Sequence, residues 1–217
     1  YAIGWLDGDG GRGSNLIPAP RSITLKPGEK RSFTRFIAVG VSPAAAVGEV
    51  LSHSHVAGTS VIVIQLNDAK SGTPITSATV NIKSDKQSLP AYPNDKGKVT
   101  VNALPGEYVV EIIDRGRPTI RRVLTLEEDA AGATRLNENL GTLSGVKFNI
   151  TNEIEKSIPC KVQFIGTEGT KTPDLGPQNR AHGCKDQWHS ERGDFFVALD
   201  PGKYKIVITR GPEHSRH

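Results

Sequence analysis

The sequence predicts an all-β protein built from tandem small antiparallel β-sandwiches of the immunoglobulin-like or transthyretin-like kind. The 217 residues include 23 Gly and 14 Pro, a composition typical of many short strands joined by turns. Short segments alternate apolar and polar residues, as half-buried strands do. One pattern also occurs twice, over residues 61–116 and 146–211, and such repetition indicates two copies of one structural unit.

The two copies share a glycine, alternating apolar residues, a Pro-Gly turn and a tyrosine at matching distances. The shared positions are Gly97 and Gly193, Pro105-Gly106 and Pro201-Gly202, and Tyr108 and Tyr204. Upstream of them, period-two alternation directs one set of side chains inward in each copy. These sets are Ala78, Val80 and Ile82 in the first copy and Cys160, Val162 and Phe164 in the second. Each copy is therefore expected to bury its set between two sheets.

Four segments follow from these patterns. Residues 1–41 hold too few apolar residues for a core and are predicted to be the closing strands of an upstream β-sandwich, with turns at 8–13 and 26–28. Residues 42–57 are predicted to form a short helix, started by Ser42-Pro43, and a linker. Residues 58–143 and 144–217 are the two sandwiches. The missing upstream and downstream domains of a longer protein are the expected partners.

The second copy contains an inserted loop at residues 166–191. Val80 and Pro105 are 25 positions apart, whereas Val162 and Pro201 are 39 apart, so the second copy has 39 − 25 = 14 additional positions. Function concentrates in loops carried by a regular scaffold. The candidate contact residues are Thr172, Pro173, Asp174, His182, Trp188 and His189. Proline turns stiffen the loop and Trp188 offers apolar area, so an interdomain docking surface or a ligand loop is predicted.

The two cysteines leave three states open. Cys160 and Cys184 can form a disulfide that pins the loop to the core, or they can remain free thiols. Together with His182 and His189 they can also supply the four ligands of a zinc site, although their spacing matches no common zinc motif. The pair His53 and His55 is interpreted as linker histidines rather than metal ligands.

Composition and motifs exclude several classes of function. The net charge of +4 arises from 27 basic and 23 acidic residues scattered along the chain, so nucleic acid is not an expected ligand. No apolar stretch is long enough to span a membrane. No nucleophile elbow, phosphate loop or grouped acid and base occurs, so no complete active site and no cofactor are expected within this chain. The oligomeric state stays open.

Several motifs resemble known families. The first copy, with Ala78-Thr-Val-Asn-Ile82 and Leu104-Pro-Gly-Glu-Tyr108, resembles the carboxypeptidase-regulatory-like or transthyretin-like modules of bacterial secreted proteins. The second copy, with Ile158-Pro-Cys-Lys-Val162 and Thr172-Pro-Asp-Leu-Gly-Pro177, is similar to the segment before the catalytic domain in CehA/McbA-type metallohydrolases. Their catalytic part is a PHP (polymerase and histidinol phosphatase) barrel. Residues 22–41 are similar to the closing strands of a galactose-mutarotase-type sandwich.

The resemblance implies an accessory role in a secreted or periplasmic hydrolase. The β-region would position or dock a catalytic domain, and the divalent metal would be bound in that missing domain rather than in this chain. The alternative is a cell-surface binding module that recognises a glycan or a protein through residues 166–191. Both functions are expectations for the structure to address.

Overall fold

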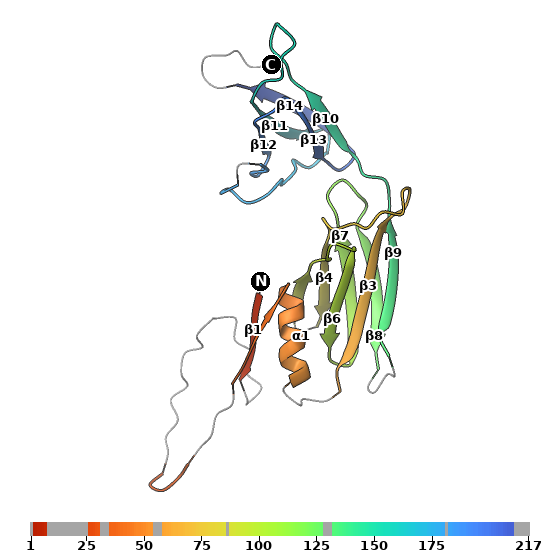
Figure 1. Cartoon of the computed structure of the whole chain (residues 1–217), viewed down its shortest axis with the longest axis vertical. Coiled ribbons are helices and arrows are strands. Elements are labelled where there is room, and N and C mark those ends of the chain that lie inside the picture. Colours follow the sequence, from red (N-terminus) through yellow and green to blue (C-terminus); the bar gives the residue numbers. More distant parts are fainter. Residues whose placement is uncertain are drawn as a thin grey trace. The chain divides into compact units, whose positions relative to one another are not determined.

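The computed structural model describes residues 2–7, 26–30, 35–53, 58–85, 87–127, 132–180 and 182–210 (Figure 1). The chain divides into two compact units. Unit 1 comprises Tyr1–Asp114 and Thr119–Gly141, and unit 2 comprises Arg115–Pro118 and Thr142–His217. In the described residues no helix has the length and apolar character needed to cross a bilayer. The turn predicted at residues 8–13 lies outside the described residues.

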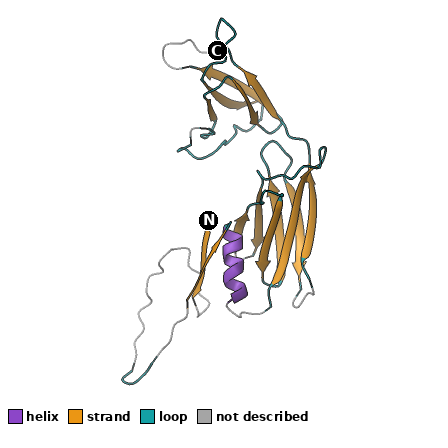
Figure 2. Ribbon diagram, viewed as in Figure 1, coloured by secondary structure: helices purple, strands orange, loops and turns teal. Residues whose placement is uncertain are grey.

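Unit 1 contains a β-sandwich of two sheets, so the all-β prediction is confirmed (Figure 2). The first sheet has the order β6 (Lys98–Ala103), β3 (Ser60–Asp68), β9 (Thr134–Leu140). The second has the order β5 (Gln87–Ala91), β4 (Thr79–Ser84), β7 (Gly106–Ile113), β8 (Ile120–Leu126). The β3–β9 pair is parallel, and the other neighbours are antiparallel. Ile62, Ile64 and Leu66 on β3 are buried in the same core as Ala78, Val80 and Ile82, as the alternation predicted.

Unit 2 is a smaller sandwich. One sheet pairs β10 (Gly145–Asn149) with β13 (Asp194–Ala198), and the other has the order β12 (Gln187–Ser190), β11 (Cys160–Thr167), β14 (Lys203–Thr209). Cys160, Val162 and Phe164 are buried, so their predicted inward orientation is confirmed. The Phe148 ring stacks on Phe195 with centroids 4.9 Å apart and meets Phe164 edge-on at 5.8 Å. Aromatic pairs in these geometries add to the stability gained by burial.

The repeat glycines occupy the same position in both units. The N–H of Leu66 donates to Gly97 O, and the N–H of Ile150 donates to Gly193 O, each at 2.9 Å. At both glycines an added Cβ would point at backbone atoms of a neighbouring segment. At Gly97, for example, it would lie 2.5 Å from Leu66 O. The repeat therefore preserves glycine where two backbone segments come too close for a side chain.

The repeat tyrosines also have the same role in both units. Tyr108 Oη donates to Leu104 O at 2.8 Å, and Tyr204 Oη donates to Asp200 O at 2.9 Å. In each unit this bond spans the Pro-Gly segment, where the chain leaves one sheet and enters the other. The tyrosine thus braces the crossover between the two sheets with a bond to the preceding backbone.

Strands β5 and β12 were not predicted from the sequence. Val80 of β4 is opposite Ala91 of β5, and Val162 of β11 is opposite Trp188 of β12, so the two strands are equivalent in the repeat. The last part of the predicted loop 166–191 is therefore an edge strand. The sequence did not predict this strand because the polar residues of a short edge strand give little periodic signal.

The segment before the first sandwich contains β1 (Ala2–Asp7), antiparallel to β2 (Arg35–Gly40), and helix α1 (Pro43–His53). The predicted helix start is confirmed, because the Ala45 N–H donates to Ser42 Oγ at 3.2 Å. The predicted turn at residues 26–28 is confirmed by a bond from Glu29 N to Lys26 O of 2.9 Å. The helix extends through His53, which the sequence had assigned to the linker.

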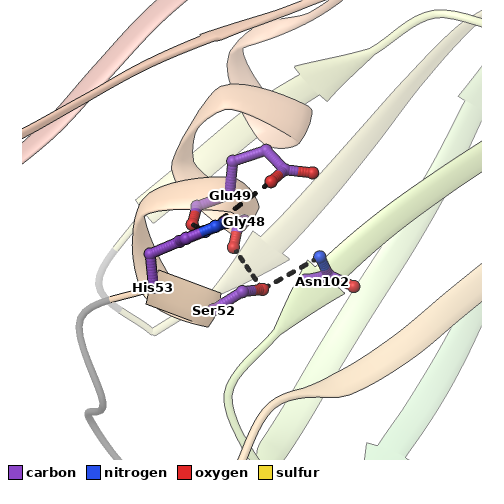
Figure 3. Close-up of polar contacts among 5 residues, drawn as sticks. All are labelled: Gly48, Glu49, Ser52, His53 and Asn102. Carbon is purple, nitrogen blue, oxygen red and sulfur yellow. Dashed lines mark hydrogen bonds and ion pairs between the residues drawn. The ribbon is translucent and has the colours of Figure 1, made fainter.

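Helix α1 is attached to the sandwich of unit 1. Asn102 Nδ2 on β6 donates to Ser52 Oγ at 3.0 Å, and Ser52 Oγ donates to Gly48 O at 2.9 Å (Figure 3). His53 Nδ1 lies 2.9 Å from Glu49 O in the last helical turn. The helix is thus part of unit 1, while the assignment of residues 1–41 to an upstream sandwich stays a prediction.

Candidate functional site

The loop between β11 and β12 in unit 2 is held in a fixed conformation. Leu175 is buried in the core of the unit and anchors the first arm of the loop. The Leu175 N–H donates to Lys185 O at 2.5 Å, and the Lys185 N–H donates to Gly176 O at 2.7 Å, so the two arms pair. An ordered loop loses little conformational entropy when a partner binds.

The second arm is also fastened to β11. The N–H of Phe164 donates to Asp186 O at 2.9 Å, and Gln163 Nε2 donates to Asp186 Oδ2 at 2.8 Å. Cys184 and Gln187 exchange backbone hydrogen bonds of 2.8 and 2.9 Å and form a tight turn into β12. The chain therefore enters the edge strand from a defined direction.

Thr172, Pro173 and Asp174 lie on the first arm and have local structural roles. Thr172 Oγ1 accepts a hydrogen bond from Gly166 N at 3.0 Å, and Asp174 Oδ1 accepts one from Gly176 N at 3.1 Å. Arg115 Nη2, within the same unit, donates to Asp174 O at 3.1 Å. Thr172 and Asp174 are exposed and Pro173 is half-buried, so the first arm offers polar groups to a partner.

His182, Trp188 and His189 lie close together on the second arm and β12. His182 Nδ1 is 2.6 Å from His189 O, and the His182 ring is 6.2 Å from the Trp188 ring. Trp188 is half-buried against the core of its own unit, because it pairs with the inward Val162 and shares its face of the sheet. The sequence suggested Trp188 as exposed docking area, and the structure assigns its ring to core packing instead.

The structure contains no bond between the two cysteines, and the disulfide that would pin the loop to the core stays a prediction. Cys160 is buried, and Cys184 Sγ donates to Gln178 O at 3.4 Å. In the part of the chain that the structure describes, no three His, Cys, Asp or Glu side chains are close enough to hold a metal. Cys160, His182, Cys184 and His189 are thus not brought together as one ligand set.

Unit 2 is expected to lose stability at alkaline pH. Burial raises the pKa of the Cys160 thiol, and burial together with the Asp200 carboxylate raises the pKa of Tyr204. The folded state favours the neutral thiol of Cys160 and the neutral phenol of Tyr204 over their charged forms. The stability that unit 2 gains from this is fully present below the pKa values of the unfolded chain, about 8.5 for Cys and about 10 for Tyr. It is lost as the pH rises through the higher pKa values of the folded state.

The measurement is urea unfolding from pH 7 to 11, followed by Trp188 fluorescence in a Trp5→Phe background. A Cys160→Ala variant is expected to reduce the decline between pH 8 and 10, because the titrating thiol is gone. An identical decline in both proteins would contradict this assignment.

A second candidate surface lies on β2 in unit 1 and was not identified from the sequence. Ile37 and Val39 alternate along β2 and Val41 follows directly after the strand; their side chains are 77%, 61% and 74% exposed. A groove beside them is lined by β2, by Glu49, Val50 and His53 of α1, and by β6. Large apolar side chains aligned on one exposed sheet face are typical of an interaction surface. The signal was present in the alternation of residues 37–41.

The comparisons with known proteins found no matching family model and no matching curated protein. Among solved structures the chain is similar to the Bacillus anthracis TIE protein, with 15% identity and a TM-score of 0.34 over 71% of this chain and 28% of that one. It is similar to the shaft pilin spaA from Lactobacillus rhamnosus GG, with 15% identity, 72% and 89% coverage and a TM-score of 0.43. A DUF3823 family protein from Bacteroides ovatus has 10% identity, 73% and 94% coverage and a TM-score of 0.31.

Proposed function

We propose that this chain is a non-catalytic accessory region of a secreted or periplasmic metal-dependent hydrolase of the PHP type, and that it positions the catalytic domain. The observation that supports docking of this region within a longer protein is the exposed apolar patch on and just after β2, formed by Ile37, Val39 and Val41. A two-stranded sheet cannot bury such a face by itself. The hydrolase assignment depends on the resemblance of residues 158–177 to the segment that precedes PHP domains.

The occupant that we propose for the β2 face is a sheet of a preceding β-sandwich in the longer protein. Strands β1 and β2 are antiparallel and already present a regular pleated surface. Apolar side chains at every second position match the way one sheet packs on another. Divalent metal would be bound in the catalytic domain, outside this chain, and metal analysis of the longer protein and of this chain would separate the two locations.

Replacing Ile37, Val39 and Val41 together by threonine is expected to destabilise the longer protein by roughly 2–5 kcal/mol, because buried hydroxyls would replace apolar groups. In the 217-residue chain the same changes are expected to alter stability by less than about 1 kcal/mol, because exposed positions tolerate polar groups. Thermal unfolding of both proteins measures the difference.

The matched control is Val123→Thr, since Val123 lies on β8 and is also largely exposed. Val123→Thr should leave the thermal stability of both the longer protein and the 217-residue chain nearly unchanged. Equal, small effects of the triple substitution in both proteins would argue against docking through β2.

The alternative function is a binding module that recognises a glycan or protein through residues 166–191. It is supported by the combination of a loop fixed by backbone hydrogen bonds with exposed Asp174, His182 and His189 side chains. Glycan-array binding by the chain that is lost in an Asp174→Ala/His189→Ala variant would favour this function. An array without signal would leave the docking role as the better account.

A further inference from the structure

Two strands far apart in the sequence are parallel neighbours in unit 1. Among the described strands of its sandwich, β3 comes first along the chain and β9 comes last, and the two lie side by side (Figure 1). Their register runs from Ile62 opposite Thr134 to Asp68 opposite Leu140, over seven residue pairs. The chain therefore enters this strand pair at one end, at Ser60, and leaves it at the other end, at Leu140.

This arrangement determines how tension along the chain acts on the strand pair. A pull on the segment before β3 and an opposite pull on the segment after β9 draw the two strands past each other, along their own axes. The hydrogen bonds of a parallel ladder are evenly spaced between the strands. Because the whole ladder is displaced at once, its bonds share the load and have to break together. An antiparallel pair that is pulled apart at one end loses its bonds one after another.

Strand β3 is also held by its surroundings. Its opposite edge pairs with β6, so β3 is the central strand of its sheet. Ile62, Ile64 and Leu66 are each 0% exposed. Sliding β3 along its axis would draw these three side chains out of a close-packed core. Resistance to shear therefore comes from side-chain packing as well as from the ladder.

Strand β9 is fastened to the second sheet by a fork of hydrogen bonds. Arg122 of β8 donates to Glu138 of β9 from Nε to Oε1 at 2.7 Å and from Nη2 to Oε2 at 2.8 Å. Glu138 is 6% exposed and Leu140 is 1% exposed. Two parallel charge-assisted bonds restrict the position of β9 along its axis as well as its distance from β8. The Ala69 N–H also donates to Leu140 O at 2.9 Å, beyond the end of β3.

We propose that unit 1 is a mechanical element that resists tension along the chain. The β3–β9 ladder is the part that bears the pull, and the fork between Arg122 and Glu138 is a second attachment that holds β9 in place. Such an element keeps the segments before β3 and after β9 at a fixed spacing when the protein is under tension. The inference follows from the topology of unit 1 and does not depend on the proposed docking through β2.

A force measurement on single molecules of the 217-residue chain tests this proposal. The starting protein is Cys160→Ala/Cys184→Ala, so that introduced cysteines are the only attachment points. The sheared variant adds Gly58→Cys and Thr142→Cys, both at exposed positions just outside β3 and β9. Tension between these two points draws β3 and β9 past each other and does not pass through α1.

The matched control differs in the direction of the pull. The peeled variant adds Lys70→Cys and Lys96→Cys, at exposed positions that follow β3 and precede β6. Strands β3 and β6 are antiparallel, with Gln65 opposite Lys98, so the two points lie at the same end of that pair. Tension between them opens the β3–β6 ladder bond by bond.

At the same loading rate, the sheared variant is expected to rupture at a force at least about twofold higher than the peeled variant, because its ladder bonds break together. Equal forces, or a lower force in the sheared variant, would overturn the proposal. This comparison is decisive by itself, since both variants retain the β3–β9 ladder and the fork, and all four attachment positions are exposed.

A further variant tests the fork. Glu138→Gln in the sheared variant is expected to shorten the lifetime at constant force by roughly fivefold to twentyfold, since it removes two charge-assisted bonds. The control is Glu111→Gln, which breaks the ion pairs with Lys83 and Arg121 within the other sheet. It should leave this lifetime nearly unchanged, although both substitutions lower stability in urea. A Glu138→Gln variant that loses stability in urea but keeps its lifetime under shear would show that the fork bears no load.

Discussion

The Phe164→Ala variant is expected to lose about 3–5 kcal/mol of stability in unit 2, the range for removing a buried aromatic ring. Phe164 is 0% exposed at the centre of the smaller sandwich, and its ring meets Phe148 edge-on. Alanine would leave a cavity between the sheets and remove an aromatic pair. Because unit 2 is small, a loss of this size is comparable with its whole expected stability.

Urea unfolding monitored by Trp188 fluorescence in a Trp5→Phe background measures this loss. The control is Phe196→Ala, on β13, whose side chain is 45% exposed and should cost less than about 1.5 kcal/mol. Hydrogen exchange at Ile62 and Ile64 in unit 1 should remain slow in both variants. Similar losses in the two variants would show that Phe164 is not at the centre of this core.

The Gly97→Ala variant is expected to lose about 2–5 kcal/mol in unit 1, from two causes that add. Gly97 has φ of +70°, which is strained for alanine by roughly 1–2 kcal/mol. A methyl group there would also lie 2.5 Å from Leu66 O, which belongs to the backbone and cannot move aside without disturbing β3. Overpacking of this kind costs a further 1–3 kcal/mol, roughly.

Gly72→Ala separates the two causes. Gly72 has the same φ of +70° but no atom within 4 Å of an added Cβ, so only the backbone strain of roughly 1–2 kcal/mol is expected. Thermal and urea unfolding of unit 1 compare the variants. If the two alanines cost the same, the close approach of Gly97 to β3 contributes nothing and the explanation of the repeat glycine is incorrect.

Local signals in the sequence were sufficient for much of the fold. The alternation through Val80 and Val162 predicted the inward faces of β4 and β11, because a strand between two sheets needs apolar residues at every second position. Ser42 predicted the helix start, because its hydroxyl satisfies a free amide at the first turn.

Edge strands and loop anchors depended on contacts between distant residues. Strand β5 contains Pro90 and no β-branched residue, a sequence tolerated at an edge but without a strand signal. Leu175 is an isolated apolar residue in a polar segment, so nothing local predicted its burial in the core of unit 2. Likewise, the half-buried position of Trp188 follows from the register of β12 with β11, which the sequence does not specify.

The sequence predicted a loop that the structure shows between β11 and β12, while the role of this loop as a site stays a prediction. The residues 166–191 do form the largest departure from the repeat, and their exposed polar groups include Thr172 and Asp174. Their conformation results from bonds between Leu175, Gly176 and Lys185, pairs that no sequence pattern indicated. The alternation of Ile37 and Val39 was visible in the sequence, but their exposure is known only from the structure.

The proposed accessory role depends on docking through the exposed side chains of Ile37, Val39 and Val41. Hydrogen exchange at the backbone amides of residues 36–40, measured in the 217-residue chain and in the longer protein, tests it most directly. Docking of a preceding sheet predicts exchange slower by about a hundredfold in the longer protein, because opening would then require undocking. Equal exchange rates in the two proteins would show that this face stays exposed and would contradict the claim.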